Sequence, residues 1–166
     1  PTVGLSVAYE LEIAGLVQAL ELAGIPPLRE DRDEGHPFIL AGGPLTFSNP
    51  LPLGPYVDAV LMGEADETMP QAIDILFEVR SLDAARAAIA REIPSAYVPS
   101  LHGDTMPPIA ACADELLPAY SQIMTPHTEL RDMFLIEPER GCHRGCTYCV
   151  MRRSTNGGMR LVEPER

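Results

Sequence analysis

Basic residues are few in this chain. Its 12 Lys and Arg stand against 24 Asp and Glu, which gives a formal net charge of -12. The electric field of such a protein repels nucleic acids and anionic membrane surfaces. The charge therefore argues against a general nucleic-acid-binding surface, but it leaves room for a local basic patch at Arg140, Arg144, Arg152, Arg153 and Arg160.

Long apolar runs and a secretory leader are also missing. No apolar run reaches the roughly 18 to 20 residues that span a bilayer, and no charged, apolar and small-residue signal peptide opens the chain. We therefore expect a cytoplasmic protein without membrane contact. Thiols stay reduced in that compartment, so clustered cysteines are more often metal ligands than disulfides.

The chain lacks an initiating Met, opens on a strand-like run and ends without a recognisable stop, so we expect a fragment of a longer protein. Its 166 residues and 46% hydrophobic content, with a mean hydropathy of +0.02, are those of an ordinary globular protein. This length fits one core, or one core and part of another.

Short apolar strands alternate with helical patterns in the first half of the sequence. Apolar residues from Ile13 to Leu20 recur at helical spacing. Thr68 and Gln71 have the spacing of a capping box, and Pro70 suits the first turn of a helix. Nearly continuous apolar strands predict an α/β fold with a parallel sheet covered on both faces. We expect strands over residues 2–7, 37–43 and 58–63 and helices over residues 9–24 and 63–80.

The sequence pattern changes twice along the chain. Residues 1–80 form the predicted α/β domain, which we expect to be incomplete at its N-terminus. Residues 81–130 are a Pro-rich linker with a short Ala-rich helix over 81–92 and room for a small hairpin. A new strand over 132–142 opens a second domain at residue 131, which would run, truncated, to residue 166.

Three of the 4 cysteines lie in the stretch GCHRGCTYC, at Cys142, Cys146 and Cys149. A structural zinc site normally has four protein ligands in paired knuckles, and a fourth ligand at His143 would lie next to Cys142 in a tight loop. Ferredoxins space their cysteines C-x2-C-x2-C and close all four iron positions. The C-x3-C-x2-C spacing here favours three thiolates on a cubane cluster with one iron open, and a zinc or redox loop remains the alternative. Cys112 is expected to be a small buried hydrophobic residue.

The three cysteines, Tyr148 before the last of them, and the apolar run MFLIEPERG resemble the signature of radical S-adenosylmethionine (radical SAM) enzymes. That resemblance implies that Cys142, Cys146 and Cys149 hold a [4Fe–4S] cluster whose open iron is chelated by S-adenosylmethionine. It also implies that Tyr148 lies beside the adenine. The expected partners are small-molecule cofactors and a reductant such as flavodoxin or ferredoxin.

The runs VGLSV, ILAGGP and VDAVLMGEADE resemble the later half of the cobalamin-binding domain that precedes many radical SAM domains, which implies a partial doubly wound, Rossmann-like sheet. Combined with the linker and the run ELRDMFLIEPERGC, they are similar to an uncharacterised bacterial group of such proteins. In that fold the ligand lies at the carboxyl ends of the strands. The resemblance implies cobalamin as a cofactor, with contacts at Ser6, Gly42, Gly43, Gly63 and Glu64. Alternatively, the glycines only make turns and Ser6 is a strand-end hydroxyl.

The D-x-H-x-x-G stretch that carries the cobalt-coordinating His in such domains is missing. None of His36, His102, His127 and His143 has that context. Gly157 and Gly158 follow the cysteines too soon for a second-strand glycine motif and are expected to form a loop. Three function classes remain: a radical SAM enzyme with a cobalamin-binding domain; a cofactor-free α/β scaffold attached to a radical SAM barrel; and a zinc-binding interaction module.

Overall fold

A computed structural model describes residues 1–149 and 159–163 of the chain. The chain divides into two compact units, Pro1–Ala111 and Cys112–Arg166, which are considered separately below. The boundary between the compact units therefore follows Ala111. The domain boundaries expected at residues 80 and 130 stay predictions. In the described part of the chain, no helix is both long and apolar enough to cross a membrane.

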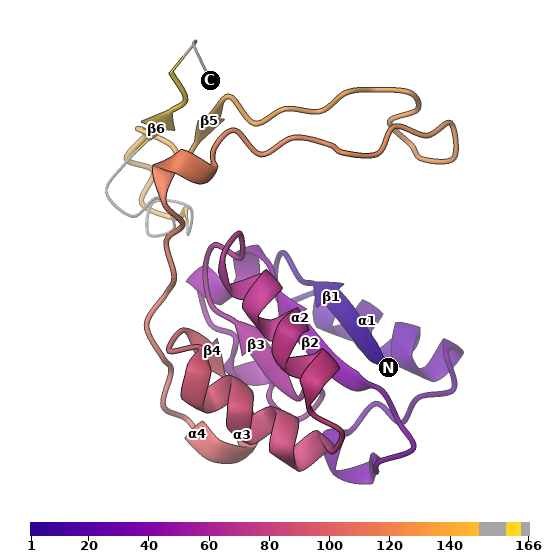
Figure 1. Cartoon of the computed structure of the whole chain (residues 1–166). Helices are drawn as coiled ribbons and strands as arrows, with labels where there is room; N and C mark the ends of the chain where they lie inside the picture. The colour runs from indigo at the N-terminus through magenta and orange to yellow at the C-terminus, as the bar shows by residue number, and fades with distance from the viewer. Residues whose placement is uncertain (150–158, 164–166) are drawn as a thin grey trace. The chain divides into compact units, whose positions relative to one another are not determined.

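The first unit is built on a four-stranded sheet in the order β1-β2-β3-β4 (Figure 1). Adjacent strands are parallel from β1 to β3, with Ser6 beside Gly42 and Ala41 beside Val60, and β4 is antiparallel to β3. The predicted α/β fold with a partial, Rossmann-like parallel sheet is confirmed, and the antiparallel β4 is an addition that the sequence pattern did not indicate. The strands are β1 (Thr2–Ser6), β2 (Phe38–Gly42), β3 (Ala59–Leu61) and β4 (Ala96–Tyr97).

Helices cover both faces of this sheet, with α1 on the face opposite α2 and α3 (Figure 1). Side chains of β2 alternate between the two cores, since Ile39 packs with Leu20 of α1 and Leu40 with Ile89 of α3. The α-helices are α1 (Glu12–Leu22), α2 (Thr68–Glu78), α3 (Leu82–Glu92) and α4 (Pro99–His102). Short 3-10 turns are η1 (Arg29–Asp31), η2 (Pro44–Phe47), η3 (Leu51–Leu53) and η4 (Asp114–Leu116).

The start of α2 differs from the expected capping box. Thr68 is the first helical residue, Glu67 is the N-cap, and no side chain caps the helix. The Thr68 hydroxyl is buried and makes no hydrogen bond to a described residue. The capping-box prediction is therefore wrong, although Pro70 does lie in the first turn, where its missing N–H is tolerated. Ser81 does cap α3, because its hydroxyl accepts a 3.2 Å hydrogen bond from the Ala84 amide.

The second unit contains an extended hairpin and one short ladder. Between Ala119 and Glu137 the chain pairs with itself, with an isolated antiparallel bridge joining Tyr120 to Ile136. A continuous strand over 132–142 does not form, and in its place β5 (Glu139–Arg140) pairs antiparallel with β6 (Arg160–Leu161). Among the described residues there is no radical SAM barrel.

The Asp58 carboxylate holds the amino ends of the strands together from a fully buried position. It accepts a 2.7 Å hydrogen bond from the Ile39 amide of β2, and it pairs with Arg32 at 3.4 Å and with Arg86 of α3 at 2.5 Å. Burial lowers the pKa of Arg32, and the Asp58 carboxylate opposes that shift. Each charge offsets the desolvation of the others, so removing one partner leaves the rest uncompensated.

Replacing Asp58 tests this network. We expect Asp58→Ala to lower the free energy of unfolding by about 3 kcal/mol or more, because a buried guanidinium and a strand amide lose their acceptor. Urea denaturation followed by circular dichroism measures the change. Asp83→Ala is the matched control, because Asp83 also pairs with Arg86 but its side chain is 91% exposed; its cost should stay below about 1 kcal/mol. Equal losses in the two variants would contradict the assignment.

Candidate functional site

The carboxyl ends of β1, β2 and β3 bring together four of the residues expected to bind a cofactor. Ser6 and Gly42 are direct partners in the ladder. The buried Thr46 links the other two, since its Oγ1 donates to the Gly43 carbonyl at 2.7 Å and accepts from the Gly63 amide at 3.1 Å. The sequence carried no signal for Thr46, because a single Thr after a glycine turn is common in any loop.

The space beside Gly43 is filled by the protein itself. Gly43 has φ +99°, and a Cβ there would lie 2.7 Å from the Ser6 Oγ and 2.8 Å from the Val7 carbonyl oxygen. This glycine is needed for its positive φ and for the close approach of β1. It therefore leaves no open cradle for the nucleotide tail of cobalamin.

The space beside Gly63 is also filled by the protein itself. It has φ +91°, and a Cβ there would collide with the Ala110 backbone and the Ile109 side chain. Ala110 forms a parallel bridge to Gly63, donating to the Met62 carbonyl at 2.8 Å and accepting from the Glu64 amide at 3.0 Å. The segment around Ala110 thus lies where a ligand would have to approach. Taken with Gly43, these positions do not fit a cobalamin tail.

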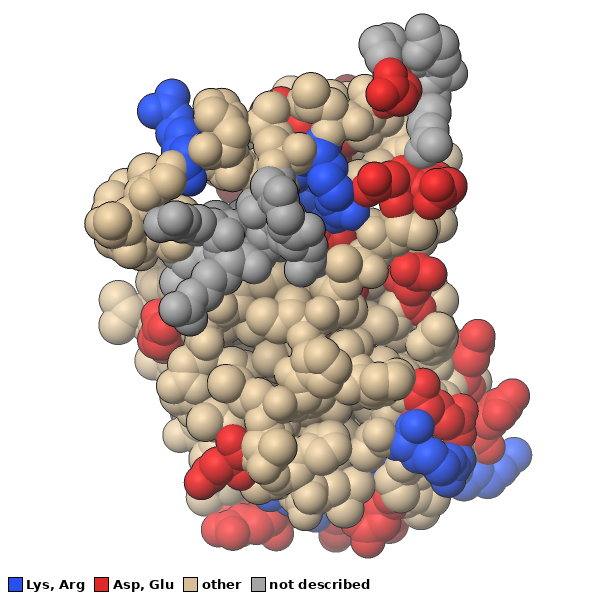
Figure 2. Space-filling model, turned by 90° about the vertical axis from the view of Figure 1, so that its left-hand side faces the viewer, with Lys and Arg blue, Asp and Glu red and all other residues tan. Residues whose placement is uncertain are grey.

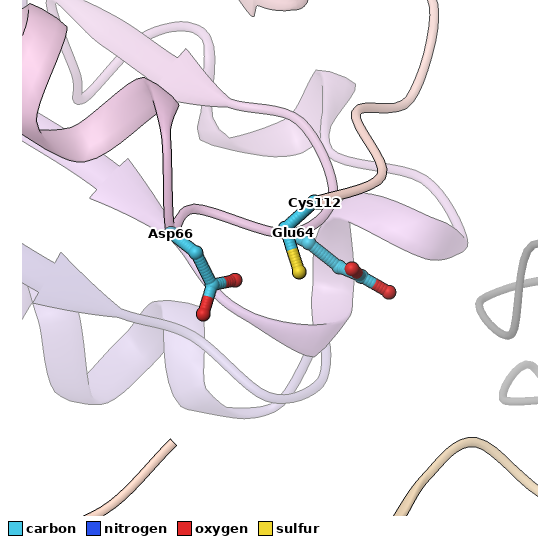
Figure 3. Close-up of side chains that lie close together, drawn as sticks. All are labelled: Glu64, Asp66 and Cys112. Carbon is cyan, nitrogen blue, oxygen red and sulfur yellow. The ribbon is translucent and has the colours of Figure 1, made fainter. Parts of the chain in front are cut away.

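Glu64 lies in the segment that leaves β3, where it was expected to cap the strand. It is half-buried, as is Asp66 two residues later. Figure 3 draws both side chains together with Cys112. Because Glu64 and Asp66 belong to the first unit and Cys112 opens the second, we assign no joint site to the three.

The three clustered cysteines lie in a turning loop that follows β5. Cys142, Cys146 and Cys149 are free thiols and are half-buried. The loop folds on itself, since the Cys149 amide donates to the Cys146 carbonyl at 3.3 Å. The Arg144 amide donates to the Cys142 Sγ at 3.4 Å.

The distances between the sulfur atoms of these cysteines help to decide which kind of metal site they could form. Among the described residues, no three of Cys142, His143, Cys146 and Cys149 have ligand atoms within 4.8 Å of one another. Zinc–sulfur bonds of about 2.3 Å would draw the ligands of a tetrahedral site to within about 4 Å. A [4Fe–4S] cluster binds each thiolate through a different iron and so tolerates a wider spacing. The cysteines therefore fit an iron–sulfur cluster better than a closed zinc site.

Neighbouring residues of the loop are exposed to solvent. The Tyr148 side chain is 88% exposed, and His143 is exposed as well. An exposed aromatic ring two residues after a thiol ligand is available to stack on a flat ligand. Gly157 and Gly158 lie outside the described residues.

The proposed basic patch is largely neutralised where it is described. Arg140 pairs with Glu137 at 2.6 Å and Arg160 with Asp114 at 2.9 Å. Arg152 and Arg153 lie outside the described residues. Figure 2 shows one face of the molecule, which is mostly uncharged and carries its acidic side chains mainly toward the margins. This face offers no broad positive surface for a nucleic acid.

The described chain is thus an α/β unit followed in sequence by a segment that carries three clustered cysteines. Residues 1–99 match the family model described as radical SAM proteins, N-terminal. The chain therefore belongs to this family of radical SAM proteins, a membership that points in general to an enzyme using a [4Fe–4S] cluster and S-adenosylmethionine. The comparison with curated proteins finds no match, and neither does the comparison with solved structures.

Gly43 can be tested for the role that its surroundings indicate. We expect Gly43→Ala to lower the free energy of unfolding by about 1 to 3 kcal/mol, because the new methyl group meets backbone atoms and the positive φ is strained. Gly4→Ala in β1 is the control, since nothing lies within 4 Å of a Cβ there. Urea denaturation without any ligand measures both. Wild-type stability in Gly43→Ala would show that the glycine serves something other than folding.

Proposed function

We propose that this chain is part of a radical SAM enzyme in which Cys142, Cys146 and Cys149 bind a [4Fe–4S] cluster. The observation that carries the proposal is a C-x3-C-x2-C loop of three free, half-buried thiols, downstream of a region that matches the radical SAM family over residues 1–99. Three thiolates leave one iron without a protein ligand, which is the position that S-adenosylmethionine would take through its amino and carboxylate groups.

A bound cluster, once reduced, would supply the electron for reductive cleavage of S-adenosylmethionine to methionine and a 5′-deoxyadenosyl radical. The residues of this chain would bind the cluster and orient S-adenosylmethionine beside it. The hydrogen bond from the Arg144 amide to the Cys142 sulfur would help to orient that side chain toward the cluster. We assign Tyr148, whose ring is exposed, to stacking on the adenine. Electrons would come from a reductant such as flavodoxin or ferredoxin, in a cytoplasm that keeps the thiols reduced.

Iron counting on the full-length protein tests the ligand assignment. After anaerobic reconstitution we expect about four irons per chain and a charge-transfer band that dithionite bleaches. Cys142→Ala, Cys146→Ala and Cys149→Ala should each remove the cluster, because one iron loses its anchor. Cys112→Ser is the control and should keep four irons, since it removes a thiol while keeping a hydrogen-bond acceptor. A complete cluster in any of the three loop variants would contradict the assignment.

We further propose that the α/β unit acts as a scaffold for the radical SAM domain without binding cobalamin through the predicted positions. The support is the filled space at Gly43 and Gly63, two of the five positions expected to contact cobalamin. Tight turns that need glycine for their own backbone account for these residues without a ligand.

Cobalamin titration of the anaerobically purified full-length protein tests whether the α/β unit is a scaffold without cobalamin or a cobalamin-binding domain. We expect no shift in the cobalamin absorption spectrum at ligand concentrations up to about 100 μM, a level at which a specific small-molecule site is normally occupied. Tight binding that Gly42→Val weakens and Gly4→Val, in the middle of β1, leaves unchanged would instead assign cobalamin to this edge. The iron content of the same sample reports on the cluster independently.

A further inference from the structure

The ladder of β5 and β6 closes the two ends of the cysteine loop. Glu139 is the partner of Leu161 and Arg140 of Arg160, and the Val162 amide extends the pairing by donating to the Pro138 carbonyl at 3.0 Å. The described residues 141–149, which carry the three loop cysteines, therefore leave the ladder after Arg140, and the chain is back in the ladder at Arg160 (Figure 1). Contacts that hold this short ladder in place therefore bear on the residues directly after β5.

Two arginines face each other across the ladder, an arrangement that weakens it. Like charges at directly opposed positions of an antiparallel pair are destabilising, and an isolated two-stranded ladder is marginal in water even without them. The side chains of both Arg140 and Arg160 are only 18% exposed, so solvent screens them incompletely. An opposed pair of this kind needs a compensating set of acceptors.

Acidic side chains of the same unit supply the first part of that compensation. Arg140 forms a bidentate pair with Glu137, with its Nε 2.8 Å and its Nη2 2.6 Å from the two carboxylate oxygens. The Arg160 Nη1 lies 2.9 Å from the Asp114 Oδ1. Charge-assisted hydrogen bonds of this geometry are stronger than neutral ones and fix the orientation of the guanidinium.

Both arginines also contact Cys112, which is 5% exposed. The Arg140 Nη1 donates to its Sγ at 3.1 Å, and the Arg160 Nη1 donates to its carbonyl oxygen at 2.9 Å. The expectation that Cys112 is buried is thus confirmed, but it is an acceptor for two cations as well as a small hydrophobic residue. Cys112 therefore accepts hydrogen bonds from both strands of the ladder.

We infer that Arg140 and Arg160 are positioning residues that anchor the ends of the cysteine loop to residues 112–114 and so preorganise the three thiols for the cluster. The inference rests on the proposed function. Metal binding normally includes the cost of ordering its ligands, and that cost falls when the loop ends are already fixed. Loss of the anchor should therefore leave the ligand set intact but make the cluster easier to lose.

The test compares iron loss from variants of the full-length protein after anaerobic reconstitution. Arg160→Met removes the hydrogen bonds to Asp114 and Cys112 while keeping most of the side chain, and Arg160→Lys keeps the charge and one donor. Arg131→Met is the control, because Arg131 is exposed and lies outside β5 and β6. Iron released to a chelator over time and the electron paramagnetic resonance spectrum of the reduced cluster are measured.

We expect Arg160→Met to bind about four irons and release them about tenfold faster than wild type, the effect of losing one or two charge-assisted hydrogen bonds. Arg160→Lys should recover part of the difference, and Arg131→Met should match wild type. A broadened resonance spectrum in Arg160→Met alone would show that the loop holds the cluster in several arrangements.

Two results would overturn parts of this account separately. If Arg160→Met releases iron at a rate within about twofold of that of Arg131→Met, the anchoring role of Arg160 is wrong, but the proposed function is unaffected. If the wild-type protein binds no cluster, both the proposed function and the anchoring role that rests on it are wrong. Should Arg160→Met fail to fold by circular dichroism, Asp114→Asn weakens the same ion pair from an exposed position and is judged by the same comparison.

Discussion

The architecture of the first unit depends on a single buried carboxylate. Asp58 precedes β3, yet it bonds the amide of Ile39 in β2, the guanidinium of Arg32 in the preceding loop and that of Arg86 in α3. Two strands, one connection and one helix are therefore fixed relative to one another at the amino ends of the strands. A buried charge of this kind is tolerated only when it is fully paired, so the network favours one arrangement of the sheet and its helices.

The opposite ends of the same strands are fixed by close backbone packing rather than by charge. Thr46 bridges Gly43 and Gly63, and both glycines are pressed against other parts of the chain. In open α/β sheets this edge is where ligands usually bind. Here the protein occupies much of it, which is why the cofactor chemistry is assigned to the cysteine loop and the α/β unit is regarded as a scaffold.

The sequence predicted those parts of the fold that depend on local pattern. Apolar runs located β1, β2 and β3 to within a residue or two, and helical spacing located α1. It missed β4, a two-residue strand that follows α2 and α3 in the chain and pairs antiparallel with β3, because so short a strand has no periodic pattern of its own. It also misjudged Thr68, because the spacing of a capping box does not fix where the helix begins. The clustered cysteines were visible as a motif, whereas the contacts of Arg140 and Arg160 with Cys112 join residues 28 and 48 positions apart and carry no local signal.

The central claim is that the cluster has one iron open to S-adenosylmethionine, and electron paramagnetic resonance of the reduced full-length protein tests it most directly. A reduced [4Fe–4S] cluster with three protein thiolates should give a spectrum whose g values shift when S-adenosylmethionine is added, because the ligand binds iron itself. S-adenosylhomocysteine, which keeps the amino and carboxylate groups but lacks the sulfonium, should give a different shift. A spectrum that neither compound changes would contradict the account, because it would mean that no iron is accessible to the cofactor.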